Sequence, residues 1–209
     1  MNRLYTFRGY ILAALAILLL SIPGVGFPSR QTLDQSTSSV TYFMLWVPFI
    51  LSETLFLLSV LLRIQARRSI GEHTRGSTHD ADQLVTWGVY SKIRHPLYLS
   101  NTGIGISFAL FHLGFSWETI LFTAVLVMFE IVLSRLEDRY LETRFQDLWR
   151  NWKSATPAFV PYKSRGSRSG SANDNSSTPR SFIQSFRADK STWIWLCFFI
   201  VLLVLRKIL

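Results

Sequence analysis

The chain of 209 residues contains two short segments in which charged and aromatic side chains occur together, and residues 88–100 (GVYSKIRHPLYLS) form the first of them. Pro96 suits the first turn of a helix, where its missing N–H loses no hydrogen bond. Arg94 and His95 then lie just before that helix, beside backbone N–H groups that have no partner within it. Such a position favours a carboxylate or another anionic group. The alternative is an interfacial anchor, in which the arginine and the tyrosines of this segment only face lipid headgroups.

The second segment is residues 136–152 (LEDRYLETRFQDLWRNW). Its apolar side chains recur at helical spacing, at Leu141, Phe145, Leu148 and Trp152. This pattern predicts an amphipathic helix at the membrane surface. Glu137 and Asp138 stand at its start, where two adjacent carboxylates need cationic partners such as Arg139. The alternative is a solvated surface helix with charge pairs one turn apart.

A helical hairpin with its turn around Gly114 and Ser116 separates the two segments. A hairpin returns the chain to the face of the membrane that it left. Residues 94–98 and 137–139 are therefore expected to lie close together. This proximity favours a functional site over two unrelated surface segments.

The combined pattern resembles the integral-membrane methyltransferases, which include isoprenylcysteine carboxyl methyltransferases and phospholipid N-methyltransferases. The pattern is R-H-P-x-Y, a hairpin, and then E-[E/D]-x-x-L-x-x-x-F followed by spaced aromatics and prolines. The matching residues are Arg94, His95, Pro96, Tyr98, Glu137, Asp138, Leu141, Phe145, Trp149, Trp152, Pro157 and Pro161. The resemblance covers about residues 45–162. It implies S-adenosyl-L-methionine as cofactor at the cytoplasmic face and a lipophilic acceptor that enters from the bilayer.

Five positions depart from the usual pattern. Gln146 stands where a glycine commonly follows the phenylalanine, and Trp149 and Trp152 replace tyrosines. Ser100 replaces a common glycine, and Asp138 a common glutamate. None of these changes removes a charge needed for cofactor binding, but together they leave the subfamily open.

The resemblance also implies the roles of the site residues. The cofactor-binding set is Tyr90, Arg94, His95, Tyr98, Leu99, Glu137 and Asp138, and the catalytic set is Arg139, Glu142 and Arg144. In this scheme the acidic pair takes the ammonium group or the ribose hydroxyls of the cofactor, and arginines orient an anionic acceptor. A carboxylate acceptor needs no general base, whereas an amine must first lose a proton, for example to Glu142.

Two other functions are compatible with parts of this pattern. Sterol and fatty-chain reductases share a related architecture and an R-H-x-x-Y-like segment but use NADPH. A small non-enzymatic scaffold that recruits anionic lipid is the second alternative. Histidines and the single Cys197 show no spacing typical of metal ligands, so no metal site is expected.

The elements that must position these residues are long apolar stretches of the length that a bilayer requires. We expect spanning helices over residues 10–27, 41–62, 96–113, 117–133 and 193–205. The predicted fold class is therefore all-α, a polytopic membrane bundle of about five transmembrane helices with a cytoplasmic-face amphipathic helix after the fourth. Residues 1–29 are expected to be a retained helix rather than a cleaved signal peptide.

The basic residues predict the orientation. With a cytoplasmic N-terminus, 19 Lys and Arg residues fall on the inside and 3 on the outside, as the positive-inside rule requires. The net charge of +9 then reflects topology and attraction to anionic lipids rather than nucleic-acid binding. The expected location is the inner membrane of a bacterium or the endoplasmic reticulum of a eukaryote. No oligomeric state is predicted.

The predicted domains are a four-helix methyltransferase-like body over residues 1–162, with its motifs in 45–162, a flexible basic and Ser-rich cytoplasmic linker over 163–190, and a C-terminal transmembrane helix over 191–209. The linker composition disfavours a packed structure. We expect deletion of residues 163–209 to leave cofactor binding intact. Glu53 and Glu130, within predicted spans, are functional candidates because ionisable groups at such depth are costly.

Overall fold

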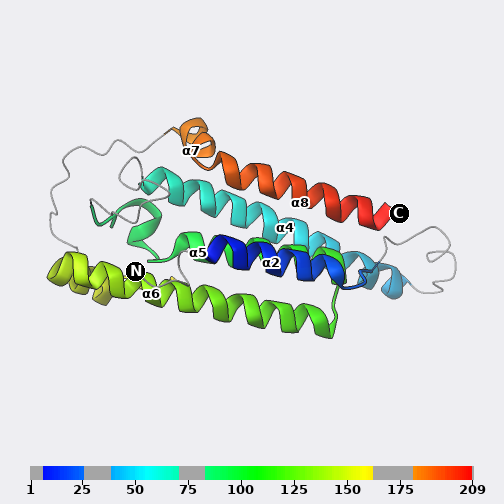
Figure 1. The fold of residues 1–209 in the computed structure, drawn as a ribbon. Coiled ribbons are helices and arrows are strands. Elements are labelled where there is room, and N and C mark those ends of the chain that lie inside the picture. The colour runs from blue at the N-terminus through cyan, green and yellow to red at the C-terminus, as the bar shows by residue number, and fades with distance from the viewer. Residues whose placement is uncertain (1–6, 26–38, 71–82, 162–180, 209) are drawn as a thin grey trace. The chain divides into compact units, whose positions relative to one another are not determined.

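The computed structural model describes residues 7–25, 39–70, 83–161 and 181–208. The regular elements in these ranges are helices, and they confirm the all-α class (Figure 1). In chain order they are α2 (Arg8–Ser21), α4 (Ser39–Ile70), the 3-10 helix η1 (Gly88–Ser91), α5 (Pro96–Leu113), α6 (Trp117–Ala155), α7 (Phe182–Ala188) and α8 (Lys190–Ile208).

Two of these helices are long and apolar enough to cross a membrane, namely α6 and the part of α4 from Trp46 to Ile70. The pair α7 and α8 provides a third candidate if it counts as one span, whereas the apolar helix α2 is shorter. The structure thus supports a membrane protein, but the expected count of five spans is not confirmed. Nor is a separate amphipathic helix over residues 136–152 confirmed, because residues 136–145 continue the helix that begins at Trp117, and the break comes only at Gln146.

The chain divides into two compact units, which we describe separately. Unit 1 comprises Met1–Val60, Asn101–Leu133 and Ser191–Leu209, and unit 2 comprises Leu61–Ser100 and Ser134–Lys190. This division follows spatial contacts rather than chain order, so it does not test the predicted domain boundaries. Residues 182–188 of the predicted linker form a helix, and 162–180 lie outside the described residues.

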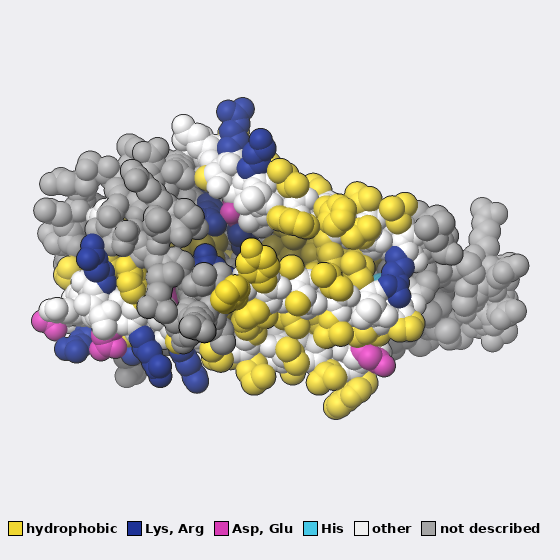
Figure 2. All heavy atoms as spheres, in the orientation of Figure 1, with side chains coloured by type: hydrophobic (Ala, Val, Ile, Leu, Met, Phe, Trp, Pro, Cys, Tyr) yellow, Lys and Arg dark blue, Asp and Glu magenta, His cyan; other side chains and the backbone are white. Residues whose placement is uncertain are grey.

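The core of unit 1 is formed where several helices bury apolar side chains against one another. Leu19 of α2, Ala109 and Leu113 of α5, and Phe122 and Leu126 of α6 form one buried cluster. Hydrophobic side chains also cover the outer faces of α2 and α8 (Figure 2). Apolar side chains on both the inner and outer sides of helices are typical of a membrane-embedded bundle.

The turn between α5 and α6 forms the predicted hairpin. Gly114 has a φ of +62°, a conformation that glycine adopts without steric cost. The hydroxyl of Ser116 accepts a hydrogen bond from the backbone N–H of Thr119 at 3.2 Å, which caps the first turn of α6. The predicted turn at Gly114 and Ser116 is therefore confirmed.

The ionisable residues of the apolar helices in unit 1 differ in burial. Glu130 is buried, whereas Glu53 is exposed. His112 is also buried, and its Nε2 lies 3.0 Å from the carbonyl oxygen of Ile22, just after α2. His112 thus contributes to the end of α2, and the functional roles of the two glutamates stay predictions.

In unit 2, the end of α4 packs against η1. Gly88 approaches α4 so closely that a Cβ atom there would lie 2.1 Å from Oγ of Ser69. The same hydroxyl accepts a hydrogen bond from the backbone N–H of Val89 at 3.3 Å. With its φ of +62°, Gly88 permits both the turn and this close approach. The end of α4 is thereby joined to the segment that leads into α5.

Candidate functional site

The start of α5 is held by the segment that follows α6. The backbone N–H of Arg94 donates to the carbonyl oxygen of Pro157 at 2.8 Å, and that of His95 donates to Ala158 at 3.0 Å. Helix α6 ends at Ala155, because the residue before a proline disfavours helical backbone. The carbonyl groups of Pro157 and Ala158, just after this helix end, accept hydrogen bonds from the two N–H groups before α5.

The Arg94 side chain contacts both α6 and the segment that follows it. Its Nε donates to the carbonyl oxygen of Thr156 at 3.0 Å, and its Nη1 donates to Oδ2 of Asp138 at 2.8 Å. Arginine is suited to this role because its planar guanidinium presents several donors in fixed directions. Residues from three separate parts of the chain are joined by this one side chain.

The His95 ring lies between two carboxylates. Its Nε2 is 2.9 Å from Oδ1 of Asp138, and its Nδ1 is 3.8 Å from Oε2 of Glu137. Burial by itself would lower the pKa of His95, but the hydrogen bonds and negative charges of Glu137 and Asp138 outweigh it and raise the pKa. The arrangement therefore favours the imidazolium form.

Aromatic rings cover His95. The ring of Tyr98 lies 5.6 Å from that of His95, and the ring of Phe159 lies 5.7 Å from it. These rings keep the His95 side chain only 3% exposed. The predicted cofactor residues Arg94, His95, Tyr98, Glu137 and Asp138 are thus brought together in unit 2.

Two tryptophans of α6 complete the surroundings of the cluster. Trp149 is 1% exposed, and Nζ of Lys153 lies 4.4 Å from its ring centroid, within the range of a cation–π interaction. Nε1 of Trp152 donates to the carbonyl oxygen of Tyr90 at 3.2 Å. This hydrogen bond ties η1 to α6, so Tyr90 contributes through its backbone.

Helix α6 is interrupted at Gln146, which has a φ of 44° and a ψ of −114°. The integral-membrane methyltransferases that this sequence resembles commonly have glycine at this position. A positive φ is costly for a residue with a Cβ atom. After the interruption, Trp149 is buried while Leu148 is 66% exposed. The buried Trp149 ring faces Arg94, with its centroid 5.9 Å from the guanidinium carbon.

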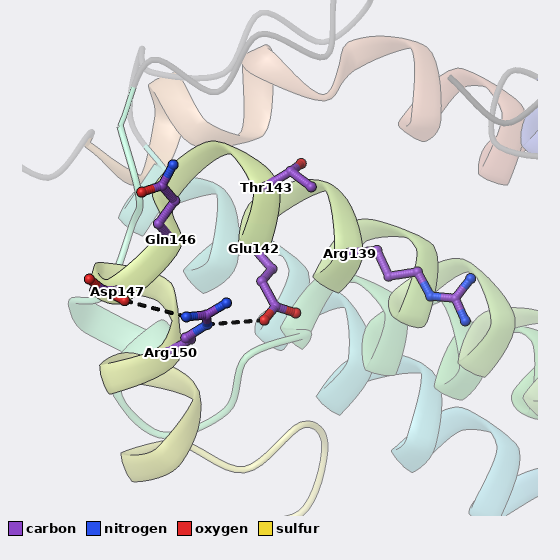
Figure 3. Close-up of a pocket in the computed structure, with 6 residues that line it drawn as sticks. All are labelled: Arg139, Glu142, Thr143, Gln146, Asp147 and Arg150. Carbon is purple, nitrogen blue, oxygen red and sulfur yellow. Dashed lines mark hydrogen bonds and ion pairs between the residues drawn. The ribbon is translucent and has the colours of Figure 1, made fainter.

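Two of the three predicted catalytic residues, Arg139 and Glu142, line an open depression on α6. The depression on α6 has a volume of about 830 Å³ and is lined by Arg139, Glu142, Thr143, Gln146, Asp147 and Arg150. Figure 3 draws these six side chains. In it, Nε of Arg150 lies 3.2 Å from Oε1 of Glu142, and its Nη1 lies 3.5 Å from Oδ1 of Asp147. Arg144 is exposed and does not line the depression. The exposed ion pairs here contribute little to stability.

The sequence pattern did not predict the contacts made by the backbone groups of residues 156–158, the ring of Phe159 and the side chain of Lys153. The contacts of residues 156–158 could have been predicted, since Pro157 indicates a helix end, after which carbonyl groups have no helical partners. Leu99 was predicted for its side chain, but the contact found near the cluster is its backbone N–H, which donates to the carbonyl oxygen of His95 at 3.1 Å. No group of three His, Cys, Asp or Glu side chains that could hold a metal ion occurs among the residues that the structure describes.

Part of the chain is similar to known proteins. Residues 47–147 match the phospholipid methyltransferase family, which confirms the resemblance to membrane methyltransferases. The chain is also 37% identical over 122 residues to the cobalt-zinc-cadmium resistance protein CzcN of Cupriavidus metallidurans, a match that covers 56% of this chain and 51% of that protein. The chain thus spans about half the length of this curated relative. No solved structure matches the chain.

Proposed function

We propose that this membrane protein, whose residues 47–147 match the phospholipid methyltransferase family, transfers a methyl group from S-adenosyl-L-methionine to a lipophilic acceptor at the cytoplasmic face. The observation that carries the proposal is the cluster in which Asp138 pairs with both Arg94 and His95. All three residues lie within the matched region. The excess of basic residues in the loops on their side of the membrane supports the cytoplasmic location.

The residues present fit the polar groups of the cofactor. Arg94 is a cation suited to its carboxylate, together with the backbone N–H groups of the first turn of α5. The imidazolium of His95, whose ring nitrogens face Glu137 and Asp138, adds positive charge nearby. Glu137 has a side chain that is 33% exposed, so its carboxylate is accessible to the ammonium group or the ribose hydroxyls. Asp138 differs, because both of its oxygens are engaged by Arg94 and His95. We assign Asp138 to positioning these two cations.

The chemistry requires little beyond orientation and exclusion of water. When bound, S-adenosyl-L-methionine supplies an electrophilic methyl group on a sulfonium. Arg94, His95 and Glu137 orient the cofactor, while Tyr98 and Phe159 cover the polar cluster with apolar surface. Fixed orientation of two reactants is a large source of rate acceleration, and excluded water prevents side reactions.

For the acceptor, the family match favours a phospholipid headgroup amine. Arg139 and Arg144 are the candidates for orienting its anionic part, and Glu142 is the candidate base that takes the proton from the amine. Because Glu142 pairs with Arg150, the base must exchange that partner when the acceptor binds. A carboxylate of a prenylated or lipid-like compound is the second acceptor class, and it would need no base.

Two alternatives receive less support. An NADPH-dependent reductase of sterol-reductase-like architecture shares the segment around His95, but the family that matches residues 47–147 is a methyltransferase family. A non-enzymatic scaffold would not require the buried pairing of Arg94 with Asp138.

The direct test is calorimetry on the full chain purified in detergent, with S-adenosylhomocysteine and NADPH as ligands. We expect S-adenosylhomocysteine to bind and NADPH not to bind. His95→Ala and Glu137→Ala should each weaken binding by about tenfold or more, since each removes a charged hydrogen-bonding group. Asp147→Asn is the matched control because that side chain is exposed on the same helix. No binding of S-adenosylhomocysteine at millimolar concentration would exclude the methyltransferase function.

A further inference from the structure

Helix α7 has a start and an end that are both fixed by local structure. At its start, Oγ of Ser181 accepts a hydrogen bond from the backbone N–H of Gln184 at 3.2 Å, and Oε1 of Gln184 accepts one from the backbone N–H of Ser181 at 3.1 Å. At its end, Asp189 has a φ of −110° and a ψ of 26°, which separates α7 from α8. The seven residues of α7 rise by only about 10 Å, so this helix alone is too short to cross a bilayer.

The residue that ends α7 is tied to the end of α4. Oδ2 of Asp189 pairs with Nε of Arg63, and Oδ1 of Asp189 lies 2.9 Å from Nη2 of Arg67. Both arginines belong to the C-terminal part of α4, in which the stretch Trp46–Ile70 is long and apolar enough to cross a membrane. Basic side chains near the end of a spanning helix lie at the level of the lipid headgroups. The end of α7 is therefore held at that level.

One side of α7 exposes large apolar side chains. Phe182, Ile183 and Phe186 are 50%, 64% and 44% exposed, and helical spacing places them within an arc of about 100°. We call these three residues the apolar face of α7. Ser185 and Asp189, on the adjoining side of the helix, are buried. The apolar face therefore points away from the rest of the protein, where contact with water would be unfavourable.

The charges next to the apolar face are positive. Arg187, in the last turn of α7, and Lys190, just after it, are both exposed, and α7 itself contains no acidic residue. A helix with aromatic and aliphatic side chains on one side and basic side chains beside them is typical of helices that lie in the surface of a bilayer. Basic residues at that depth attract anionic lipid headgroups. Both the charge and the level of α7 thus fit an anionic bilayer surface.

We propose that α7 is a membrane-surface helix, whose apolar face enters the boundary between headgroups and acyl chains while Arg187 and Lys190 bind anionic headgroups. The ion pairs of Asp189 with α4 hold the helix at this level. Unit 2, which contains the cofactor cluster, thereby has a lipid contact of its own in the C-terminal segment. This contact does not depend on methyl transfer and involves the bilayer surface rather than an acceptor.

The first test measures how close α7 lies to lipid, using the full chain in lipid nanodiscs. Cys197 is exchanged by Cys197→Ser, and a single fluorophore is attached through Ile183→Cys on the apolar face. The matched control is Ala188→Cys, which is also exposed but lies about 140° further around the helix. We expect lipids with brominated acyl chains to quench the label at position 183 about twofold or more strongly than the label at position 188.

The second test measures the preference for anionic lipid at the same label. Brominated phosphatidylglycerol and brominated phosphatidylcholine are compared at equal mole fraction in otherwise identical nanodiscs. We expect the anionic lipid to quench the label at position 183 about threefold more strongly, because basic side chains enrich it nearby. Arg187→Gln together with Lys190→Gln should abolish this preference. Lys92→Gln, which removes an exposed charge just after η1, should leave the preference unchanged.

Several outcomes would overturn the inference. Equal quenching at positions 183 and 188 would mean that the apolar face does not enter the bilayer. A label at position 183 that is shielded from aqueous iodide but not quenched by brominated lipid would identify a protein as the occupant, and light scattering would show whether it is a second copy of this chain. Equal quenching by the two headgroup classes would exclude the binding of anionic lipid. Thermal melts followed by circular dichroism check that each labelled variant is folded, and both labelled positions are exposed.

Discussion

Asp138 and His95 are 43 residues apart in the sequence, yet Oδ1 of Asp138 lies 2.9 Å from Nε2 of His95. The other oxygen of the same carboxylate accepts a hydrogen bond from Arg94 at 2.8 Å. One acidic side chain of α6 therefore fixes the two cations that precede α5. The site depends on this carboxylate for its geometry as well as for its charge balance.

The first prediction concerns Asp138→Asn. The amide keeps the shape of the side chain but removes the negative charge, so Arg94 and His95 lose their shared partner. We expect the free energy of unfolding to fall by about 2 kcal/mol, the size of a hydrogen bond to a charged group. Denaturant unfolding in detergent measures this change. Asp147→Asn, on the exposed side of the same helix, should change it by less than about 0.5 kcal/mol. Equal effects of the two variants would show that the pairing at Asp138 does not stabilise the protein.

The second prediction is a pH dependence that comes from His95. Its pKa in the folded protein is raised above the ordinary value of 6.5. The imidazolium therefore stabilises the folded state, and this contribution is fully present below pH 6.5 and is lost as the pH rises through the raised pKa. The difference in free energy of unfolding between the wild type and His95→Gln should be largest at low pH and shrink above neutrality. A difference that grows with pH would mean that His95 is held neutral.

The third prediction concerns Gln146, whose φ of 44° is the single positive value at a non-glycine residue in the described ranges. Gln146→Gly should raise the free energy of unfolding by about 1 kcal/mol, since glycine adopts positive φ without the Cβ clash. Gln146→Ala is the control, because alanine keeps the Cβ atom and should give no such gain. Denaturant unfolding of both variants under the same conditions makes the comparison. Stabilisation by alanine but not glycine would mean that this residue is helical in solution.

Much of the site could be predicted because its signals are local. Pro96 predicted the first residue of α5, and Gly114 predicted the turn of the hairpin. From that hairpin alone, residues 94–98 were expected to meet residues 137–139, and Arg94 and His95 do pair with Asp138. A proline, a glycine and a short connection constrain the backbone whatever the rest of the chain does.

The remainder could not be predicted, for different physical reasons. Arg94 donates hydrogen bonds to the backbone carbonyl groups of Thr156 and Pro157. Every residue has such a carbonyl group, so the side-chain types at these positions could not predict the contacts. The pairing of Asp189 with Arg63 spans 126 residues and has no periodic pattern. The start of helix α7, in contrast to these contacts, could have been predicted from the sequence. Ser181 and Gln184 form a capping box at its start, and that spacing was overlooked within a segment assigned to a linker by its composition.

The last prediction concerns removal of the C-terminal segment. Deletion of residues 163–209 is still expected to leave S-adenosylhomocysteine binding intact, because Arg94, His95, Glu137 and Asp138 are retained. It should nevertheless lower the free energy of unfolding by about 3 kcal/mol, since Arg63 and Arg67 lose the carboxylate of Asp189 and keep their buried charges. Replacing both arginines by glutamine in the truncated chain should recover part of this loss, whereas the same replacement in the full chain should destabilise it. Loss of cofactor binding in a truncated chain that is still folded would mean that the C-terminal segment also completes the cofactor site.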